Sequence, residues 1–223
     1  MDKFKYKEFY RRKLPHHQLG ESPLVISLRL NFTLPKHIIQ ALNQQRREYL
    51  DAQKKVSAED LEDFKKEYHK ARFEYYDKCL GKFKGSPINL MEPQYLNVIT
   101  NSLHFLHQVK YFLISYCVMP NHVHILLKPM LIEGDDENEE TYCSLSSILH
   151  SFKTFTSGKF RYLPNYVKPF WHHECYDHRV RDEKEFIYQL RYIKNNPVEA
   201  KLVKKSEDWP GLYVCDFDDL DRF

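Results

Sequence analysis

The sequence has 223 residues, of which 42% are hydrophobic and 29% charged, with a formal net charge of +3. This is enough chain for one compact domain with insertions, and its 16 tyrosines and 15 phenylalanines are scattered along it, which argues against a disordered protein. It contains no apolar run of the roughly 18 to 20 residues that a membrane span needs, no signal-peptide pattern at the N-terminus and no C-x-x-C pair or disulfide framework among its five cysteines, so we expect a cytoplasmic protein with free thiols.

The first 20 residues predict a basic N-terminal arm. Lysines and arginines, among them Arg11 and Arg12, are interleaved there with phenylalanines and tyrosines. Such a mixture can neutralise phosphate and stack on bases, although an ordinary basic arm has the same composition. The run LVISLRL at 24–30 then predicts a strand, which ends before Pro35.

The next segment, at about 36–80, predicts a charged helical hairpin. It is strongly charged and has no proline or glycine as far as Lys78. Ser57 to Asp60 resemble the capping box that begins many helices, which divides the segment into two helices. Glycines and prolines between Gly81 and Pro93 then predict a loop.

The middle of the chain predicts a helix followed by a hairpin of strands. Pro93 to Gln108 carries apolar residues near helical spacing. Residues 109–129 are the most apolar part of the sequence, and the tripeptide MPN at 119–121 divides them into two strands of plausible length. We expect this hairpin to lie in the core, and we expect the acidic stretch from Glu133 to Glu140 to be a loop.

A second amphipathic helix is predicted from Ser144 to Phe160. Lys153 and Lys159 are expected on its exposed side, and its apolar side consists of Leu145, Ile148, Leu149, Phe152 and Phe155. Prolines after this segment end the helix.

Residues 171–180 are aromatic and rich in histidine, and they predict a strand or a loop. Residues 182–196 predict a helix that ends where Pro197 follows. In chain order the elements predict an α+β fold, with an antiparallel sheet and helices packed on one face. Residues 216–223 form an acidic tail.

His122 and His124 form a His-x-His pair in the strand NHVHILL. Side chains two residues apart in a strand point to the same face, so both imidazoles can reach one metal ion. Because the chain has 12 histidines, such a pair also arises by chance. Two histidines that bind no ligand are therefore the alternative interpretation.

The last predicted helix brings together a second pair of polar side chains. Phe186, Leu190 and Ile193 form its apolar stripe, whereas Tyr192 and Asn196, four residues apart, lie together on another side. A phenol and an amide oxygen can therefore share one site. A packing or surface tyrosine is the alternative for Tyr192, as for any of the other tyrosines.

Four strings resemble successive blocks of the REP-associated tyrosine transposases, a family in the transposase IS200-like group of the HUH nucleases. They are VMPNHVHILL (118–127), SFKTFTSGKF (151–160), FWHHECYDHRVRDEKEF (170–186) and YIKNNPVEAKLV (192–203). RRKLPHHQ and LVISLRLNFTLPK upstream also resemble the family's opening. The resemblance spans most of the chain, and the charged hairpin is its least similar part. The first and last strings together are specific, and either one alone is much weaker.

The resemblance implies a role for each matching residue. His122 and His124 would be the HUH histidines and, with Asn196, would bind Mg²⁺ or Mn²⁺. Tyr192 would be the nucleophile, with Tyr188 as the alternative one turn earlier. Asn196 departs from the glutamine of the wider insertion-sequence transposases, whereas asparagine before proline is usual in the REP-associated branch.

The implied activity is cleavage and joining of single-stranded or hairpin-forming DNA by one ferredoxin-like transposase domain at 21–215. Attack by the tyrosine would give a 5′-phosphotyrosine and a free 3′-hydroxyl that can be rejoined without ATP. One alternative is a DNA-binding protein of the same fold that has lost transposition, and another is a metal-dependent phosphoesterase. A monomer and a homodimer both remain open.

The charge distribution favours a polyanionic partner. Ten of the 31 acidic residues lie in the acidic loop and the acidic tail, which leaves 21 acidic residues against 34 basic ones. The candidate phosphate contacts are Lys153, Lys159, Arg179, Arg181 and Arg191, together with Arg11 and Arg12 of the arm. For His172, His173 and His178 we favour structural or DNA-contacting roles over metal ligation.

Overall fold

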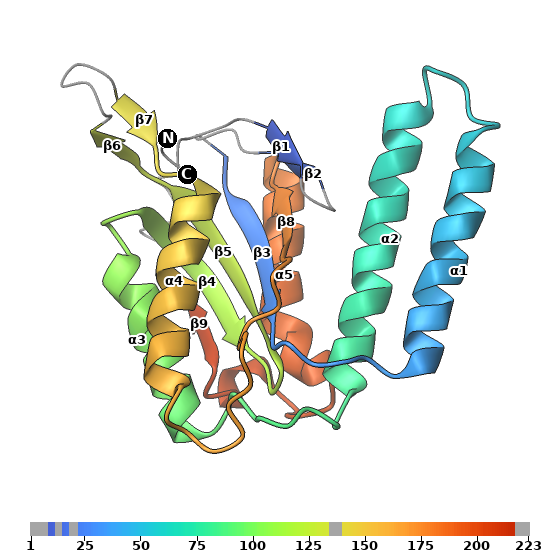
Figure 1. The fold of residues 1–223 in the computed structure, drawn as a ribbon. Coiled ribbons are helices and arrows are strands. Elements are labelled where there is room, and N and C mark those ends of the chain that lie inside the picture. Colours follow the sequence, from blue (N-terminus) through green and yellow to red (C-terminus); the bar gives the residue numbers. More distant parts are fainter. Residues whose placement is uncertain (1–8, 12–14, 18–21, 134–139, 217–223) are drawn as a thin grey trace. The chain divides into compact units, whose positions relative to one another are not determined.

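The computed structural model describes residues 9–11, 15–17, 22–133 and 140–216 (Figure 1). The chain divides into two compact units, one formed by Met1–Asn31 with Ser86–Phe223 and the other by Phe32–Gly85. Arg12, the middle of the acidic loop and the tail from residue 217 lie outside the described residues. None of the described helices combines the length and the apolar character that crossing a membrane requires.

The larger unit contains a five-stranded antiparallel sheet in the order β8-β3-β5-β4-β9. Its strands are β3 (Leu24–Arg29), β4 (Tyr111–Val118), β5 (His122–Pro129), β8 (Tyr176–Arg179) and β9 (Leu212–Val214). Two separate pairs are β1 (Phe9–Arg11) with β2 (Pro15–His17), and β6 (Leu131–Glu133) with β7 (Glu140–Tyr142). The helices are α3 (Pro93–Leu106), α4 (Leu145–Phe160), α5 (Glu183–Glu199) and the short 3-10 helix η1 (Ser206–Asp208).

The central strands β4 and β5 form the hairpin that the sequence predicts. The backbone N–H of Met119 donates to the carbonyl of His122 at 2.8 Å and closes the turn between them. Nearly every residue of both strands is buried, because helices cover the two faces of the sheet. Side chains alternate between these faces, so His122, His124 and Leu126 point to one face and the residues between them point to the other.

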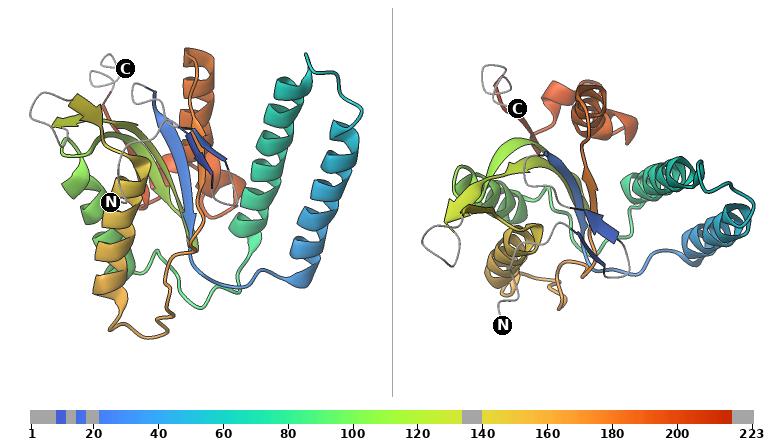
Figure 2. Two further views of the ribbon diagram at one scale, coloured as in Figure 1. Left: turned by 45° about the horizontal axis from the view of Figure 1, so that its top comes forward. Right: turned by 90° about the horizontal axis from the view of Figure 1, so that it is seen from above.

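Helices lie on both faces of the sheet (Figure 2). α3 and α4 pack on one face, as predicted, and the α+β class with an antiparallel sheet is confirmed. α5 lies on the opposite face, which the sequence did not predict. Its stripe of Phe186, Leu190 and Ile193 packs against an apolar cluster on this face of the sheet, which includes Val25, Ile114 and Leu126. The sheet therefore has two apolar faces, and each is covered by helices.

Helix α5 continues past Pro197, whereas the sequence predicted an end at Asn196. Proline removes one N–H from the helical ladder, and near the end of a helix only one bond is lost. The next bonds are made: Ala200 N–H donates to Asn196 O, and Leu202 N–H donates to Pro197 O, both at 2.9 Å. Lys201 has a positive φ of 59°, which ends the helix.

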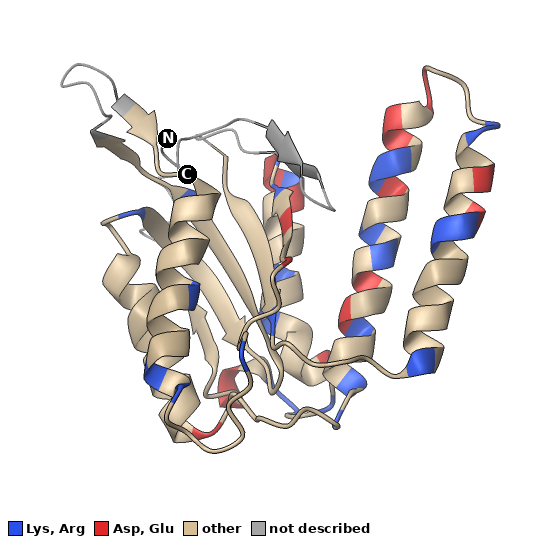
Figure 3. Cartoon of the chain, in the orientation of Figure 1, with Lys and Arg blue, Asp and Glu red and all other residues tan. Residues whose placement is uncertain are grey.

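The smaller unit is the predicted helical hairpin, α1 (Lys36–Gln53) and α2 (Leu61–Lys82). Near the turn that connects the two helices, the rings of Tyr49 and Tyr68 stack with centroids 3.7 Å apart. Acidic and basic residues mix along both helices (Figure 3). The unit has its own small apolar core, formed by Leu34, Ile38, Leu42 and Leu80.

Candidate active site

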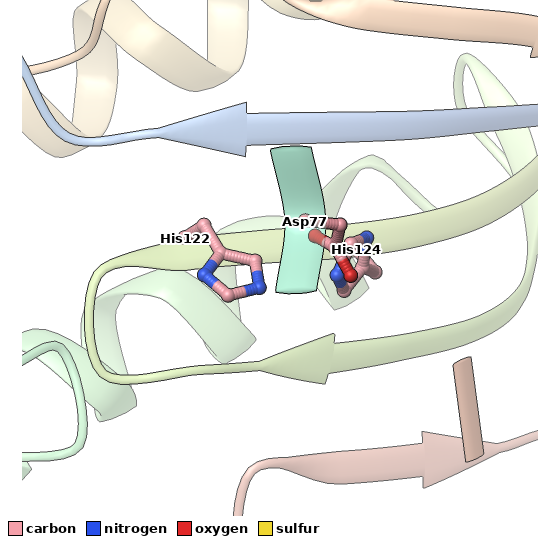
Figure 4. Close-up of side chains that lie close together, drawn as sticks. All are labelled: Asp77, His122 and His124. Atoms are coloured by element: carbon pink, nitrogen blue, oxygen red, sulfur yellow. The ribbon is translucent and has the colours of Figure 1, made fainter. Parts of the chain in front are cut away.

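His122 and His124 lie at the start of β5, where Figure 4 shows their side chains. Their exposed fractions are 1% and 0%, and their ring centroids are 4.8 Å apart. Alternation along the strand places both rings on the face of the sheet that α5 covers. Asp77, which is also labelled in Figure 4, belongs to α2 of the other unit.

Hydrogen bonds assign a proton to Nδ1 of both rings. Nδ1 of His122 lies 2.6 Å from Oδ1 of Asn121, and an amide oxygen only accepts, so Nδ1 must carry the proton. Nδ1 of His124 lies 2.6 Å from Oγ of Ser27 on β3. The amide nitrogen of Asn196 approaches Nε2 of His124, which makes that Nε2 the acceptor and places the proton on Nδ1. In both histidines the Nε2 lone pair is the one that can bind a metal.

Helix α5 brings Tyr192 and Asn196 to this histidine pair. The Tyr192 ring stands edge-on to that of His124, with centroids 5.8 Å apart and an interplanar angle of 78°. One turn later the Asn196 amide nitrogen lies 3.2 Å from His124 Nε2. Tyr188, the alternative nucleophile, is 41% exposed and stacks on Tyr192 at 6.3 Å. The two pairs of residues that the sequence singled out separately thus meet at His124.

The first turn of α5 is tied to the neighbouring strand. Nε2 of His178 on β8 lies 2.5 Å from Oε1 of Glu185, and the other carboxylate oxygen accepts the backbone N–H of Arg181 at 2.8 Å. The backbone N–H of Glu185 in turn donates to Oδ1 of Asp182, the N-cap residue. These bonds connect both β8 and the preceding turn to the helix that carries Tyr192, so they position that helix.

The two imidazoles fit a divalent metal ion, because Mn²⁺ and similar ions accept imidazole nitrogens as ligands. Each imidazole is held by a second hydrogen bond, as ligating histidines in metal sites generally are.

Sequence reasoning missed Ser27, Asn121 and the pair of His178 with Glu185. Asn121 stands next to His122 in the sequence, and its amide could have been considered as a partner of the ring. The other contacts carry no local signal, since Ser27 and His124 are 97 residues apart.

The candidate phosphate contacts do not gather in one place. Lys153 of α4 donates from Nζ to the carbonyls of His172 and His173, at 2.9 and 3.3 Å, so it is less exposed than predicted. Lys159 is exposed on the same helix. The arginines lie elsewhere: half-buried Arg179 on β8, exposed Arg181 before α5, exposed Arg191 on α5, and Arg11 on β1.

Comparisons with known proteins relate the chain to one group of proteins. No family model matches the chain. It is 26% identical over 102 residues to a Haemophilus influenzae protein named as a REP-associated tyrosine transposase, and 28% identical over 113 residues to one of Escherichia coli K12. These matches cover 44% and 46% of this chain, but only 55% and 60% of the relatives' own lengths.

A solved structure shares the fold. It is described as a REP-associated tyrosine transposase bound to a REP hairpin, and it superposes with a TM-score of 0.53 at 15% identity. The superposition covers 91% of this chain and 80% of the other. The resemblance recognised in the sequence is thereby confirmed: this chain has homologues among the REP-associated tyrosine transposases.

Proposed function

We propose that this protein cleaves and rejoins single-stranded DNA, with Tyr192 as the nucleophile and with His122, His124 and Asn196 as ligands of Mg²⁺ or Mn²⁺. One observation carries the proposal: α5 brings both Tyr192 and Asn196 to His124. A phenol beside a buried imidazole pair is the juxtaposition that metal-assisted attack on a phosphate needs. We assign this activity to a single domain at 21–215, with the helical hairpin as an insertion.

The proposed metal ligands and the residues that hydrogen-bond to them have different roles. The ion supplies charge that stabilises the phosphate oxygens as the bond order at phosphorus changes. Ser27 and Asn121 bond to Nδ1 of His124 and His122, so Nε2 is the nitrogen of each ring that would bind the ion. Asn196 contributes its amide oxygen, because the amide nitrogen has no lone pair to offer a metal.

The chemical step conserves the number of phosphate ester bonds. The Tyr192 oxygen bonds to phosphorus while the bond from phosphorus to the 3′-oxygen breaks. The phenol gives up its proton and the departing 3′-oxygen gains one, so the products are a 5′-phosphotyrosine and a 3′-hydroxyl. A 3′-hydroxyl from a second strand can reverse the step and join new ends without ATP.

The substrate that we propose is a DNA hairpin with an unpaired segment. The solved relative is described as bound to a REP hairpin. In-line attack requires access to one backbone phosphate, which an unpaired strand offers more readily than a duplex. The exposed cations Lys159, Arg181 and Arg191 are proposed to contact other phosphates of the hairpin. Half-buried Arg179 on β8, and Arg11 and Arg12 in the sequence of the arm, are further candidates.

The test is the formation of a covalent adduct. Purified protein is incubated with Mn²⁺ and a labelled single-stranded hairpin oligonucleotide, and products are separated on a denaturing gel. We expect a labelled protein band that Tyr192→Phe abolishes while binding persists, and that Tyr188→Phe, the matched control, retains. Chelation of the metal should also remove the band. An adduct that persists in Tyr192→Phe would disprove the nucleophile assignment.

The same gel separates the two alternative functions. A binding protein that has lost its activity would shift the hairpin on a native gel without forming an adduct or a cleaved product. A phosphoesterase would release cleaved DNA without any covalent protein species. Both outcomes would reject strand transfer and leave the fold assignment intact.

The position of Tyr192 favours attack within one chain. Its ring lies beside His124 of the same polypeptide. A mixture of Tyr192→Phe with His124→Ala tests this, because neither variant has a complete site of its own. We expect the mixture to form no adduct. Restored adduct formation would show that the tyrosine acts on the histidine pair of a second subunit.

A further inference from the structure

The C-terminal half of α4 and the loop after it form a cationic segment. From Thr141 to His173 the sequence has no aspartate or glutamate. It has four basic residues in this stretch, Lys153, Lys159, Arg161 and Lys168. In Figure 3 the α4 ribbon accordingly shows blue bands and no red ones. A segment of one charge sign favours a partner of the opposite sign.

Two large aromatic side chains are exposed in the same segment. Phe155 was predicted on the apolar side of α4, yet 49% of it is exposed, and Tyr162 is 78% exposed. The prediction was wrong because the face of α4 that is buried, which includes Phe152, Thr156 and Phe160, is narrower than the apolar stripe in the sequence. Exposed aromatic rings are a feature of interaction surfaces.

Each of these rings is paired with a cation. Nζ of Lys159 lies 5.5 Å from the centroid of the Phe155 ring, and Cζ of Arg161 lies 4.4 Å from that of Tyr162. Arg161 also donates a hydrogen bond to the Tyr162 hydroxyl. A ring face with a positive charge beside it offers a nucleotide both of its contacts, stacking for the base and attraction for the phosphate.

This segment lies at the end of the sheet where His122 begins β5 (Figure 1). Trp171 connects the two: its Nε1 donates to Oγ1 of Thr156 on α4 at 2.8 Å, and its backbone pairs with Leu30. The Leu30 N–H donates to the carbonyl of Asn121 at 3.0 Å. Trp171 and Leu30 therefore link α4 to Asn121, the residue that precedes His122.

We propose that Phe155, Lys159, Arg161 and Tyr162 form a stacking surface for unpaired nucleotides of the DNA substrate. The inference rests on the proposed function in one respect, that DNA is the ligand. Bases inside a duplex already stack on their neighbours, so their faces are covered. Unpaired bases present free faces, and the surface would bind the single strand next to the hairpin.

The test compares two labelled hairpins by fluorescence anisotropy in EDTA, where no cleavage is required. One hairpin has a blunt stem, and the other has the same stem with a short unpaired extension. The variant Phe155→Leu with Tyr162→Leu keeps apolar side chains but removes both rings. Phe105→Leu on α3 is the matched control, because Phe105 is 78% exposed, as Tyr162 is.

We expect the double leucine variant to lose roughly fivefold or more in affinity per ring for the extended hairpin. Its affinity for the blunt hairpin should be unchanged, and Phe105→Leu should affect neither DNA. The aromatic exchange Phe155→Tyr with Tyr162→Phe should bind as the original chain does. Unchanged binding of the extended hairpin, or an equal loss for both hairpins, would overturn the stacking surface.

The cations are tested by their salt dependence. Replacing Lys159 and Arg161 by glutamine should reduce the slope of log affinity against log salt by about 0.7 for each phosphate contact that is lost on a single strand. A slope that stays unchanged would contradict phosphate contacts here. Melting curves of every variant check that the fold is retained.

Failure of this proposal and failure of the proposed function are distinguishable. If no Tyr192 adduct forms but the double leucine substitution lowers the affinity for the extended hairpin alone, the surface stands without the enzyme. If the adduct forms and the leucine variant binds both hairpins normally, the surface alone is rejected.

Discussion

The side-chain amide nitrogen of Asn196 lies 3.2 Å from Nε2 of His124, although 72 residues separate the two in the chain. This contact uses the same imidazole lone pair that a metal would use. It also presents the wrong end of the amide, since only the oxygen can be a ligand. Metal binding would therefore break this hydrogen bond and turn the amide, so the contact competes with the ion.

Asn196→Asp should remove this competition and add a charge. Both oxygens of a carboxylate can bind a metal, and even at an effective dielectric constant of about 20 a nearby unit charge gains several kcal/mol with a cation, so we expect roughly tenfold tighter Mn²⁺ binding by calorimetry. Without metal the variant should melt at a lower temperature, because residue 196 is only 6% exposed. Asn195→Asp, on the exposed side of the same helix, is the control. Equal Mn²⁺ affinity in both variants would argue against Asn196 as a ligand.

Ser27→Ala should weaken metal binding more than it weakens the fold. The substitution removes the hydrogen-bond partner of His124 Nδ1, and loss of such a partner typically costs about 10- to 100-fold in metal affinity. The matched control is Ser115→Ala on β4, whose Oγ donates to the Tyr213 carbonyl at 2.8 Å. Both variants should lose about 1 kcal/mol of stability in urea unfolding. The proposed role of Ser27 fails if both variants retain the Mn²⁺ affinity of the original chain.

Glu185→Ala should lower adduct yield without lowering DNA binding. It removes the bonds to His178 and to the Arg181 N–H that tie the first turn of α5 to its surroundings. We expect a loss of about 1–2 kcal/mol in stability and less precise placement of Tyr192. Glu183→Ala, in the same turn and exposed, is the control. Normal adduct yield in the destabilised Glu185 variant would show that the pair stabilises the helix without positioning the tyrosine.

Local patterns predicted the elements, and long-range pairing decided the site. The apolar run at 109–129 predicted the β4–β5 hairpin, and strand alternation placed His122 and His124 on one face. The partner of His124 could not be predicted in the same way, because Ser27 faces it only in the register of β3 with β5. Nor could the stripe on α5 select a face of the sheet, since both faces are apolar. Phe155 shows the same limit on α4, where periodicity identifies a stripe but packing decides how much of it is buried.

Substitutions of Lys153 and Lys159 should distinguish a structural lysine from a DNA-binding lysine. Lys153 donates to two backbone carbonyls, so Lys153→Met should cost about 1–2 kcal/mol of stability and change DNA affinity by less than about twofold. Lys159→Met removes an exposed charge, so it should lower DNA affinity and leave stability nearly unchanged. Urea unfolding and anisotropy titrations measure the two effects. A large loss of DNA affinity in a stable Lys153→Met protein would restore Lys153 as a phosphate contact.

Acid should destabilise the fold partly through His172. Burial lowers the pKa of His172 from its ordinary value near 6.5, and Arg29 lowers it further. The unfolded chain therefore binds a proton at a higher pH than the folded chain does. The resulting stability is fully present above about pH 6.5 and is lost as the pH falls through that value toward the lower folded pKa. Urea unfolding at a series of pH values should show this decline, and His172→Gln should make it shallower while leaving the pH dependence above 7 unchanged. The decline should not vanish, because burial also lowers the pKa of His69 on α2. An identical slope below pH 6.5 in His172→Gln would mean that this side chain accepts a proton in the folded protein as readily as in the unfolded one, which its burial and the charge of Arg29 oppose.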